Sequence, residues 1–211
     1  SQTLGGRARA VDLDGTLVDS AADLGAACDH LRAQRGLPPL GTAAYRPAAS
    51  AGARGLLQVA FGVSPEDAEF EPMRLAFLQH YQAHLADNTY AFEGIAELLA
   101  GLQARGIAWG IITNKSIELT RVLVSRMPLL QSAAAVVGGN SAAASKPSAA
   151  PMLLAGQLAG VDIAQCWFVG DDLRDIQAAR NAHMALAIAA GWGYAPAAEV
   201  DDWQADAFWA R

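Results

Sequence analysis

The chain has 211 residues, a net charge of −6 at neutral pH, 53% hydrophobic residues and 17% charged residues. This composition is typical of a globular protein rather than a disordered one, and the length suits one large or two small domains. The negative charge argues against nucleic acid and anionic membrane surfaces as partners, because neither would be attracted overall.

The first predicted element is a short buried strand, residues 8–11, which leads directly into two carboxylates. Asp12 and Asp14 stand two residues apart in the segment Asp-Leu-Asp-Gly-Thr, so a continued strand would point both side chains the same way. Gly15 allows the backbone to turn tightly beneath a bound anion. One carboxylate could then attack a substrate while the other donates or accepts a proton. A plain turn at the end of a strand is the alternative interpretation, since Asp-Gly is common in turns.

The next segment, residues 20–88, is predicted to contain helices only. Amphipathic stretches such as residues 24–35 and 73–85 are separated by prolines. The first strand belongs to the sheet predicted after this segment, so the sheet-bearing core is discontinuous. We expect a core of residues 1–19 and 89–211, with residues 20–88 inserted as a helical cap that can close over a site.

From residue 90 onward, helical and strand patterns alternate along the chain. Strands are predicted at residues 107–112, 134–137, 166–169 and 184–188, and helices at 95–105, 150–158 and from 116 and 173. This alternation predicts an α/β fold, a doubly wound parallel sheet with helices on both faces.

Polar side chains follow several of the predicted strands. They are Thr113, Asn114 and Lys115 after one strand, Lys146 after another, and Asp171, Asp172 and Asp175 after a third. Ligands of open α/β sheets bind outside the carboxyl ends of the strands, so these side chains are expected to converge with Asp12 in one site.

Both lysines of the chain fall within this set of polar residues. Lys115 and Lys146 are the only lysines among 15 basic residues. A lysine carries a compact charge that suits one phosphate oxygen, whereas an arginine fork suits bidentate pairing. For Lys115, a solvated position near a helix start is an equally good interpretation.

These motifs, in this order, resemble those of the haloacid dehalogenase-like hydrolases. The resemblance implies that Asp12 is the nucleophile and that Asp14 is the general acid and base. It also implies that Thr113, Asn114 and Lys146 hold the phosphate.

The resemblance further implies a Mg²⁺ ion and residues that support it. The ion would be held by the carboxylates of Asp12 and Asp171 and by the backbone carbonyl of Asp14. Asp172 and Asp175 would hold the residues that bind the ion and the phosphate, and Asp175 would orient Lys146 or a metal-bound water. For Asp175, a capping or solvent-facing position on its helix is the alternative.

Within this family, the position of the insert resembles that of phosphatases with a C1 cap, and the chain looks most like phosphoglycolate phosphatases. It is also similar to phosphatases of N-acetylmuramic acid 6-phosphate. Both substrates carry a carboxylate, which Arg54 of the predicted cap could bind in bidentate fashion; a surface arginine is the alternative. The expected partner is therefore a small phosphate ester.

Three other classes of protein share part of this pattern. A sugar phosphomutase has the same motifs and stays an alternative. A receiver-type switch is disfavoured because such domains are shorter, and a dehalogenase is disfavoured because it does not use the group that Asp14 supplies. His80 and His84 lie four residues apart but lack an evident third ligand, so a zinc site is not expected.

Residues 1–9 lack the apolar segment of a signal peptide, and Cys28 and Cys166 are expected to be reduced. We expect a cytoplasmic monomer or homodimer.

Overall fold

The computed structural model describes residues 8–210, and these residues form two compact units. Residues 8–17 and 91–210 form the α/β unit, and Val18–Tyr90 form the helical unit. The helical unit differs by two residues at each end from the insert predicted at residues 20–88. Residues 1–7, which belong to the predicted core and to the segment inspected for a signal peptide, lie outside the described residues.

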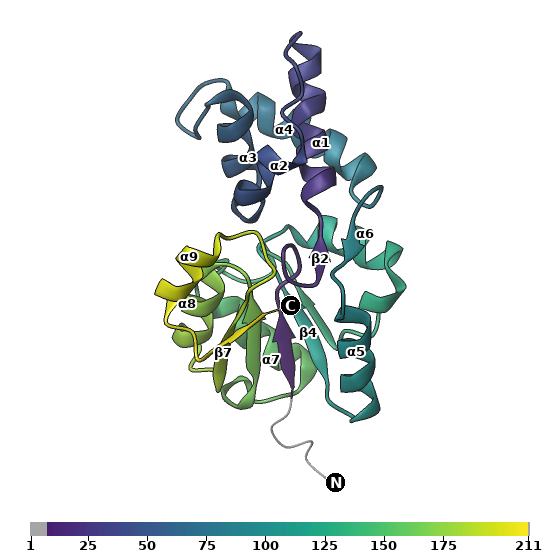
Figure 1. Ribbon diagram of the computed structural model, residues 1–211. Coiled ribbons are helices and arrows are strands. Elements are labelled where there is room, and N and C mark those ends of the chain that lie inside the picture. The colour runs from purple at the N-terminus through teal and green to yellow at the C-terminus, as the bar shows by residue number, and fades with distance from the viewer. Residues whose placement is uncertain (1–7, 211) are drawn as a thin grey trace. The chain divides into compact units, whose positions relative to one another are not determined.

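The α/β unit is built on a six-stranded sheet in which every neighbouring pair runs parallel. The strands, in spatial order, are β5 (Ala135–Val137), β4 (Trp109–Ile112), β1 (Arg9–Val11), β6 (Trp167–Gly170), β7 (Leu186–Ala190) and β8 (Ala207–Trp209). β1 lies between β4 and β6 although the helical unit follows it in the chain (Figure 1). The predicted parallel sheet is therefore confirmed, and β8 is a strand that the sequence pattern did not predict.

Helices flank this sheet and supply the other half of its core (Figure 1). They are α5 (Ile95–Ala104), α6 (Ile117–Arg126), α7 (Ala150–Ala159), α8 (Leu173–Asn181) and α9 (Ala197–Val200), with short 3₁₀ turns η2 (Pro128–Leu130), η3 (Ile163–Gln165) and η4 (Asp201–Trp203). α7 packs on β4 and β5, and α8 packs on β6 and β7. Met152 of α7 and Ile176 of α8 belong to the same buried hydrophobic cluster as Phe168 of β6.

The helical unit has a core of its own. It comprises α1 (Ala21–Gln34), α2 (Thr42–Tyr45), η1 (Arg46–Ala51), α3 (Gly52–Phe61) and α4 (Phe70–His84), and β2 (Val18–Asp19) pairs with β3 (Tyr90–Ala91) where the chain enters and leaves it. α1 packs against α3 and α4, and Leu31, Leu56 and Phe77 are buried. The prediction of a helical segment between β2 and β3 is confirmed. Among residues 8–210, no helix combines the length and the apolar character that crossing a bilayer requires.

Two buried carboxylates hold the ends of the helical unit. The Asp23 carboxylate accepts hydrogen bonds from the Asn88 N–H at 2.8 Å and the Thr89 hydroxyl at 2.8 Å. Asp19 accepts a bidentate pair from Arg46 at 3.1 and 2.7 Å. Such buried charges are stable only when paired, so these contacts fix the start of α1 against the returning chain.

Candidate active site

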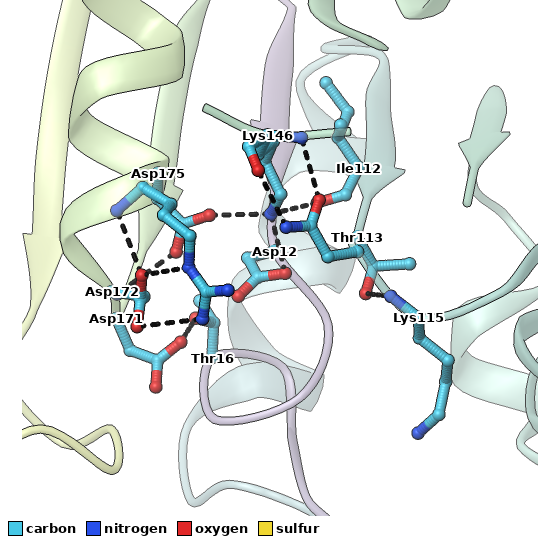
Figure 2. Close-up of polar contacts among 11 residues, drawn as sticks. Asp12, Thr16, Ile112, Thr113, Lys115, Lys146, Asp171, Asp172 and Asp175 are labelled. Carbon is cyan, nitrogen blue, oxygen red and sulfur yellow. Dashed lines mark hydrogen bonds and ion pairs between the residues drawn. The ribbon is translucent and has the colours of Figure 1, made fainter. Parts of the chain in front are cut away.

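Four strands that are neighbours in the sheet end in polar side chains at one edge. Asp12 follows β1, Thr113 follows β4 and Asp171 follows β6, while Lys146 lies in the loop between β5 and α7. Figure 2 shows Asp171, Asp172 and Asp175 on one side of Asp12, and Thr113 and Lys115 on the other. The predicted convergence of the strand-end residues is therefore what the fold produces.

Lys146 is buried at the centre of this group. Its Nζ donates to Asp12 Oδ1 at 3.0 Å, to Asp175 Oδ1 at 2.6 Å and to the Ile112 carbonyl at 2.8 Å. Burial alone would lower the pKa of the Lys146 ammonium, but Asp12 and Asp175 outweigh that cost and hold the pKa above its ordinary value. Lys146 is therefore a fixed positive charge beside Asp12.

Asp171 is held on the other side of Asp12 by two donors. Its Oδ1 accepts from the Thr16 hydroxyl at 3.1 Å, and its Oδ2 accepts from the Tyr194 N–H at 3.1 Å. Gly15 has φ +84°, and a Cβ there would overlap Asp171, so this turn requires glycine. Burial, and then the negative charges of Asp12 and Asp175, raise the pKa of Asp171 well above its ordinary value.

The start of α8 is fixed by reciprocal side-chain and backbone contacts. Asp172 caps the helix and accepts from the Arg174 N–H at 2.9 Å, while Asp175 Oδ2 accepts from the Asp172 N–H at 3.1 Å. This is a capping box, which satisfies backbone donors that a helix start otherwise leaves unpaired. Burial and Asp12 raise the pKa of Asp175 to about 7, although Lys146 opposes the shift. Asp175 is buried and so does not face solvent; it caps the helix with one oxygen and contacts the Lys146 ammonium with the other.

Asn114 contacts the backbone of the Lys146 loop with both ends of its carboxamide. Its Nδ2 donates to the Lys146 carbonyl at 2.9 Å, and its Oδ1 accepts from the Lys146 N–H at 2.9 Å. The side chain thus ties the end of β4 to the loop that carries Lys146.

Lys115 forms an ion pair with the second carboxylate of the first motif. Its Nζ lies 2.8 Å from Asp14 Oδ1, and the Lys115 side chain is 7% exposed. The Lys115 N–H donates to Thr113 Oγ1 at 3.1 Å. Lys115 is thus a buried partner of Asp14 and not a solvated surface lysine.

Three carboxylates of this group have the arrangement of a metal site. Oxygen atoms of Asp12, Asp171 and Asp175 all lie within 4.8 Å of one another, the only such group of acidic, histidine or cysteine residues in the described part of the chain. All three carboxylates also accept hydrogen bonds within the site: Asp12 from Lys146, Asp171 from Thr16 and the Tyr194 N–H, and Asp175 from Lys146 and the Asp172 N–H.

The charge balance of the site also fits a divalent cation. The carboxylates of the group are Asp12, Asp14, Asp171, Asp172 and Asp175, and its cations are Lys115, Lys146 and Arg174. With all five carboxylates ionised, the group carries two more negative than positive charges, which equals the charge of one divalent ion. Carboxylate oxygens are the ligands that hard cations such as Mg²⁺ prefer.

Arg54 and the histidine pair that was considered for zinc both lie in the helical unit. Arg54 is exposed on α3. His80 stacks between His30 and His84, with ring centroids 3.9 and 4.5 Å apart, and His84 pairs with Asp87 at 2.8 Å. The contact of Arg54 with a substrate stays a prediction.

Sequence reasoning gave no role to three residues of the site. Thr16 and the backbone of Tyr194 hold Asp171, and Arg174 pairs with Asp172 at 2.8 Å. Thr16 was present in the first motif, and an arginine in the first turn of a helix after two aspartates was a usable signal for Arg174. The Tyr194 contact depends on the path of a loop, for which the sequence carries no pattern.

Comparison with known proteins agrees with the fold and the site. Residues 10–189 match the family model of the haloacid dehalogenase-like hydrolases. A N-acetylmuramic acid 6-phosphate phosphatase of Pseudomonas putida is 39% identical over 203 residues, 95% of this chain and 91% of that protein. A phosphoglycolate phosphatase of Xanthomonas campestris is 40% identical over 204 residues, 95% and 90% of the two chains. The crystal structure of a predicted phosphoglycolate phosphatase from Haemophilus somnus superimposes with a TM-score of 0.81 at 25% identity, covering 99% and 95%.

The sheet order, the strand-end acids and the buried lysine define an α/β protein whose parallel sheet carries a cluster of acidic residues at its carboxyl edge. The chain belongs to the haloacid dehalogenase-like hydrolases. The resemblance stated from its motifs is confirmed, and membership of a hydrolase family favours an enzyme over a receiver-type switch.

Proposed function

We propose that the protein is a Mg²⁺-dependent phosphomonoesterase that acts on a small, carboxylate-bearing phosphate ester through an aspartyl-phosphate on Asp12. The observation that carries this proposal is the contact of the buried Lys146 ammonium with Asp12, 3.0 Å between Nζ and Oδ1. A carboxylate that attacks a phosphate dianion meets like charge, and a cation fixed beside it lowers that barrier.

In the first step, an Asp12 oxygen attacks phosphorus and the bond to the leaving oxygen breaks. Asp14 gives its proton to that oxygen, so the alcohol leaves neutral. The ion pair of Lys115 with Asp14 at 2.8 Å then holds the deprotonated Asp14 in place. Thr113, beside Asp12 in the sheet, contributes a hydroxyl for a phosphate oxygen.

In the second step, Asp14 accepts a proton from a water that attacks phosphorus. The bond between Asp12 and phosphorus breaks, which releases inorganic phosphate and restores the Asp12 carboxylate and the protonated Asp14. Lys146 faces Asp12 throughout, because Asp175, the Ile112 carbonyl and the Asn114 bridge hold it. We therefore assign Asn114 to positioning Lys146, which replaces its expected direct contact with phosphate.

Asp12 and Asp171, with the Asp14 carbonyl, are the ligands that we propose for Mg²⁺. When bound, the ion would offset the negative charge of the transferred phosphoryl group. The raised pKa of Asp171 and the excess negative charge of the site both support this assignment.

The carboxylate on the substrate is inferred from the relatives. One is named a phosphoglycolate phosphatase and another a N-acetylmuramic acid 6-phosphate phosphatase, and both of those esters carry a carboxylate. Phosphoglycolate is our first candidate substrate. N-acetylmuramic acid 6-phosphate is the second, because the chain is 39% identical to the Pseudomonas putida protein. Closure of the helical unit over the site, Arg54 as a reader of the carboxylate and a cytoplasmic location stay predictions.

A substrate screen tests the proposal. The purified protein is assayed with Mg²⁺ against phosphoglycolate, N-acetylmuramic acid 6-phosphate, hexose phosphates and p-nitrophenyl phosphate, with and without EDTA. Asp12→Asn is the matched control, because the amide has the same shape but is a poor nucleophile.

We expect phosphate release that EDTA abolishes and that Asp12→Asn lacks. Undiminished turnover after exhaustive chelation would contradict the metal assignment. Recovery of an isomeric sugar phosphate instead of free phosphate would favour a phosphomutase.

A further inference from the structure

Arg174 forms an ion pair with Asp172 at the edge of the candidate active site. It is the second residue of α8, and its Nε donates to Asp172 Oδ1 at 2.8 Å while Nη2 approaches Asp172 Oδ2 at 3.4 Å. Asp172 is itself fixed by the capping box with Asp175. The guanidinium is thus held on the loop that presents Asp171.

The three cations of the site differ in how far solvent reaches them. The side chains of Lys146 and Lys115 are 3% and 7% exposed, whereas that of Arg174 is 32% exposed. Lys146 and Lys115 are enclosed with the carboxylates Asp12 and Asp14. Arg174 is therefore the cation of this group that a part of the substrate beyond the phosphoryl group can reach.

Arg174 also lies within the electrostatic field of the nucleophile. The hydrogen bond to Asp172 comes first among the interactions that raise the pKa of Arg174, and the charges of Asp172, Asp175 and Asp12 add to it. A guanidinium is planar and offers donors along more than one edge, so it can hold two carboxylates at once. The ion pair with Asp172 fixes its orientation and so reduces the entropy lost when a second anion binds.

We propose that Arg174 binds the carboxylate of the alcohol part of the substrate and so determines the preference for anionic phosphate esters. This inference rests on the phosphatase function proposed above. The competing explanation is that Arg174 only neutralises Asp172 at the start of α8.

A matched pair of substrates and a matched pair of variants separate these explanations. The substrates are phosphoglycolate and its amide, phosphoglycolamide, which differ only in the charge that Arg174 would bind. Arg174→Gln is compared with Arg180→Gln, which removes an arginine from the same helix. Arg180 pairs with Asp206 at 2.8 Å, and its side chain is 45% exposed.

In the wild type we expect a higher kcat/KM for phosphoglycolate than for the amide. Arg174→Gln should reduce that ratio at least about tenfold, mainly through KM for phosphoglycolate, the scale of losing a bidentate charge pair. Arg180→Gln should leave the ratio unchanged. Arg174→Lys, which keeps the charge without the fork and serves if the Gln variant fails to fold, should give an intermediate ratio.

The failures of the two proposals are distinguishable. An active wild type whose ratio is the same in Arg174→Gln overturns the role of Arg174 and leaves the phosphatase intact. A wild type that hydrolyses no ester in the screen contradicts the proposed function. Calorimetric binding of phosphonoacetate and phosphonoacetamide then tests Arg174 alone, and equal affinity for the two overturns its role.

Discussion

At the scale of single residues, the site depends on one buried ammonium between two carboxylates. Lys146 contacts Asp12 and Asp175, and all three side chains are nearly enclosed. A buried pair is costly to break, because removing one partner leaves a charge that water cannot solvate. In the proposed mechanism, Lys146 therefore stabilises the fold as well as the reaction.

We predict that Lys146→Met destabilises the metal-free protein by about 3 kcal/mol, since Asp12 and Asp175 lose their shared cation. Activity should fall on the order of a hundredfold to a thousandfold, as expected when a group that stabilises transition-state charge is lost. Denaturant unfolding in EDTA and steady-state kinetics measure the two effects. The double variant Lys146→Met/Asp12→Asn should recover part of the stability, and no recovery would contradict the assigned cause.

The sequence predicted which residues meet but not how they pair. Asp12, Lys146 and Asp171 follow strands, and strand ends converge in a parallel sheet, so their proximity was predictable. The pairing of Lys115 with Asp14 and the Asn114 bridge depend on loop paths and rotamers, which no local pattern records. The sequence alone therefore does not distinguish the two interpretations of Lys115.

At the scale of elements, α8 connects helix capping to the site. The Asp172 side chain accepts from the backbone at the start of the helix and also anchors Arg174. A defect in this cap would therefore change both the stability of α8 and the position of the guanidinium.

We predict that Asp172→Ala lowers the free energy of unfolding by about 1 kcal/mol, the usual cost of a lost N-cap. Asp172→Asn should cost much less, because asparagine caps helices nearly as well. Ser116→Ala at the N-cap of α6 is the control, since it removes a cap without touching the acidic group. Equal unfolding energies for the Ala and Asn variants would show that the cap does not contribute.

The strands that the sequence pattern did not predict are β2, β3 and β8. The four-residue strands β4 and β6 and the long helices carry clear periodicity, and they were found within a few residues. β2 and β3 have two residues each, which is too short for an alternating pattern to stand out. β8 has three residues, as do the predicted strands β1 and β5, but it lacks their run of aliphatic residues. Their pairing partners are set by the tertiary fold.

At the scale of the whole molecule, each unit has its own core and its own buried thiol. Cys28 lies in the helical unit, where burial raises its pKa to about 12, and Cys166 lies in the α/β unit, where burial also raises its pKa. Buried thiols with raised pKa values react only when the surrounding structure opens. Thiol labelling therefore reports on each unit separately.

We predict that Mg²⁺ slows labelling of Cys166 and leaves that of Cys28 largely unchanged, because the proposed ligands belong to the α/β unit alone. Labelling followed by mass spectrometry of the two peptides measures both rates. Asp171→Asn, which removes a proposed ligand, should abolish the effect on Cys166. Equal protection of both thiols would mean that the units open together or that the ion binds elsewhere.

The central claim is that Asp12 forms a phosphoryl-enzyme intermediate. It is tested most directly by mixing the protein with substrate and Mg²⁺, quenching in acid within a single turnover, and reducing the acyl phosphate with borohydride. Peptide mass spectrometry then identifies the modified residue. The account predicts modification of Asp12 in the wild type and none in Asp12→Asn. Phosphate release with no trapped acyl phosphate, or a phosphoryl group on another residue, would contradict it.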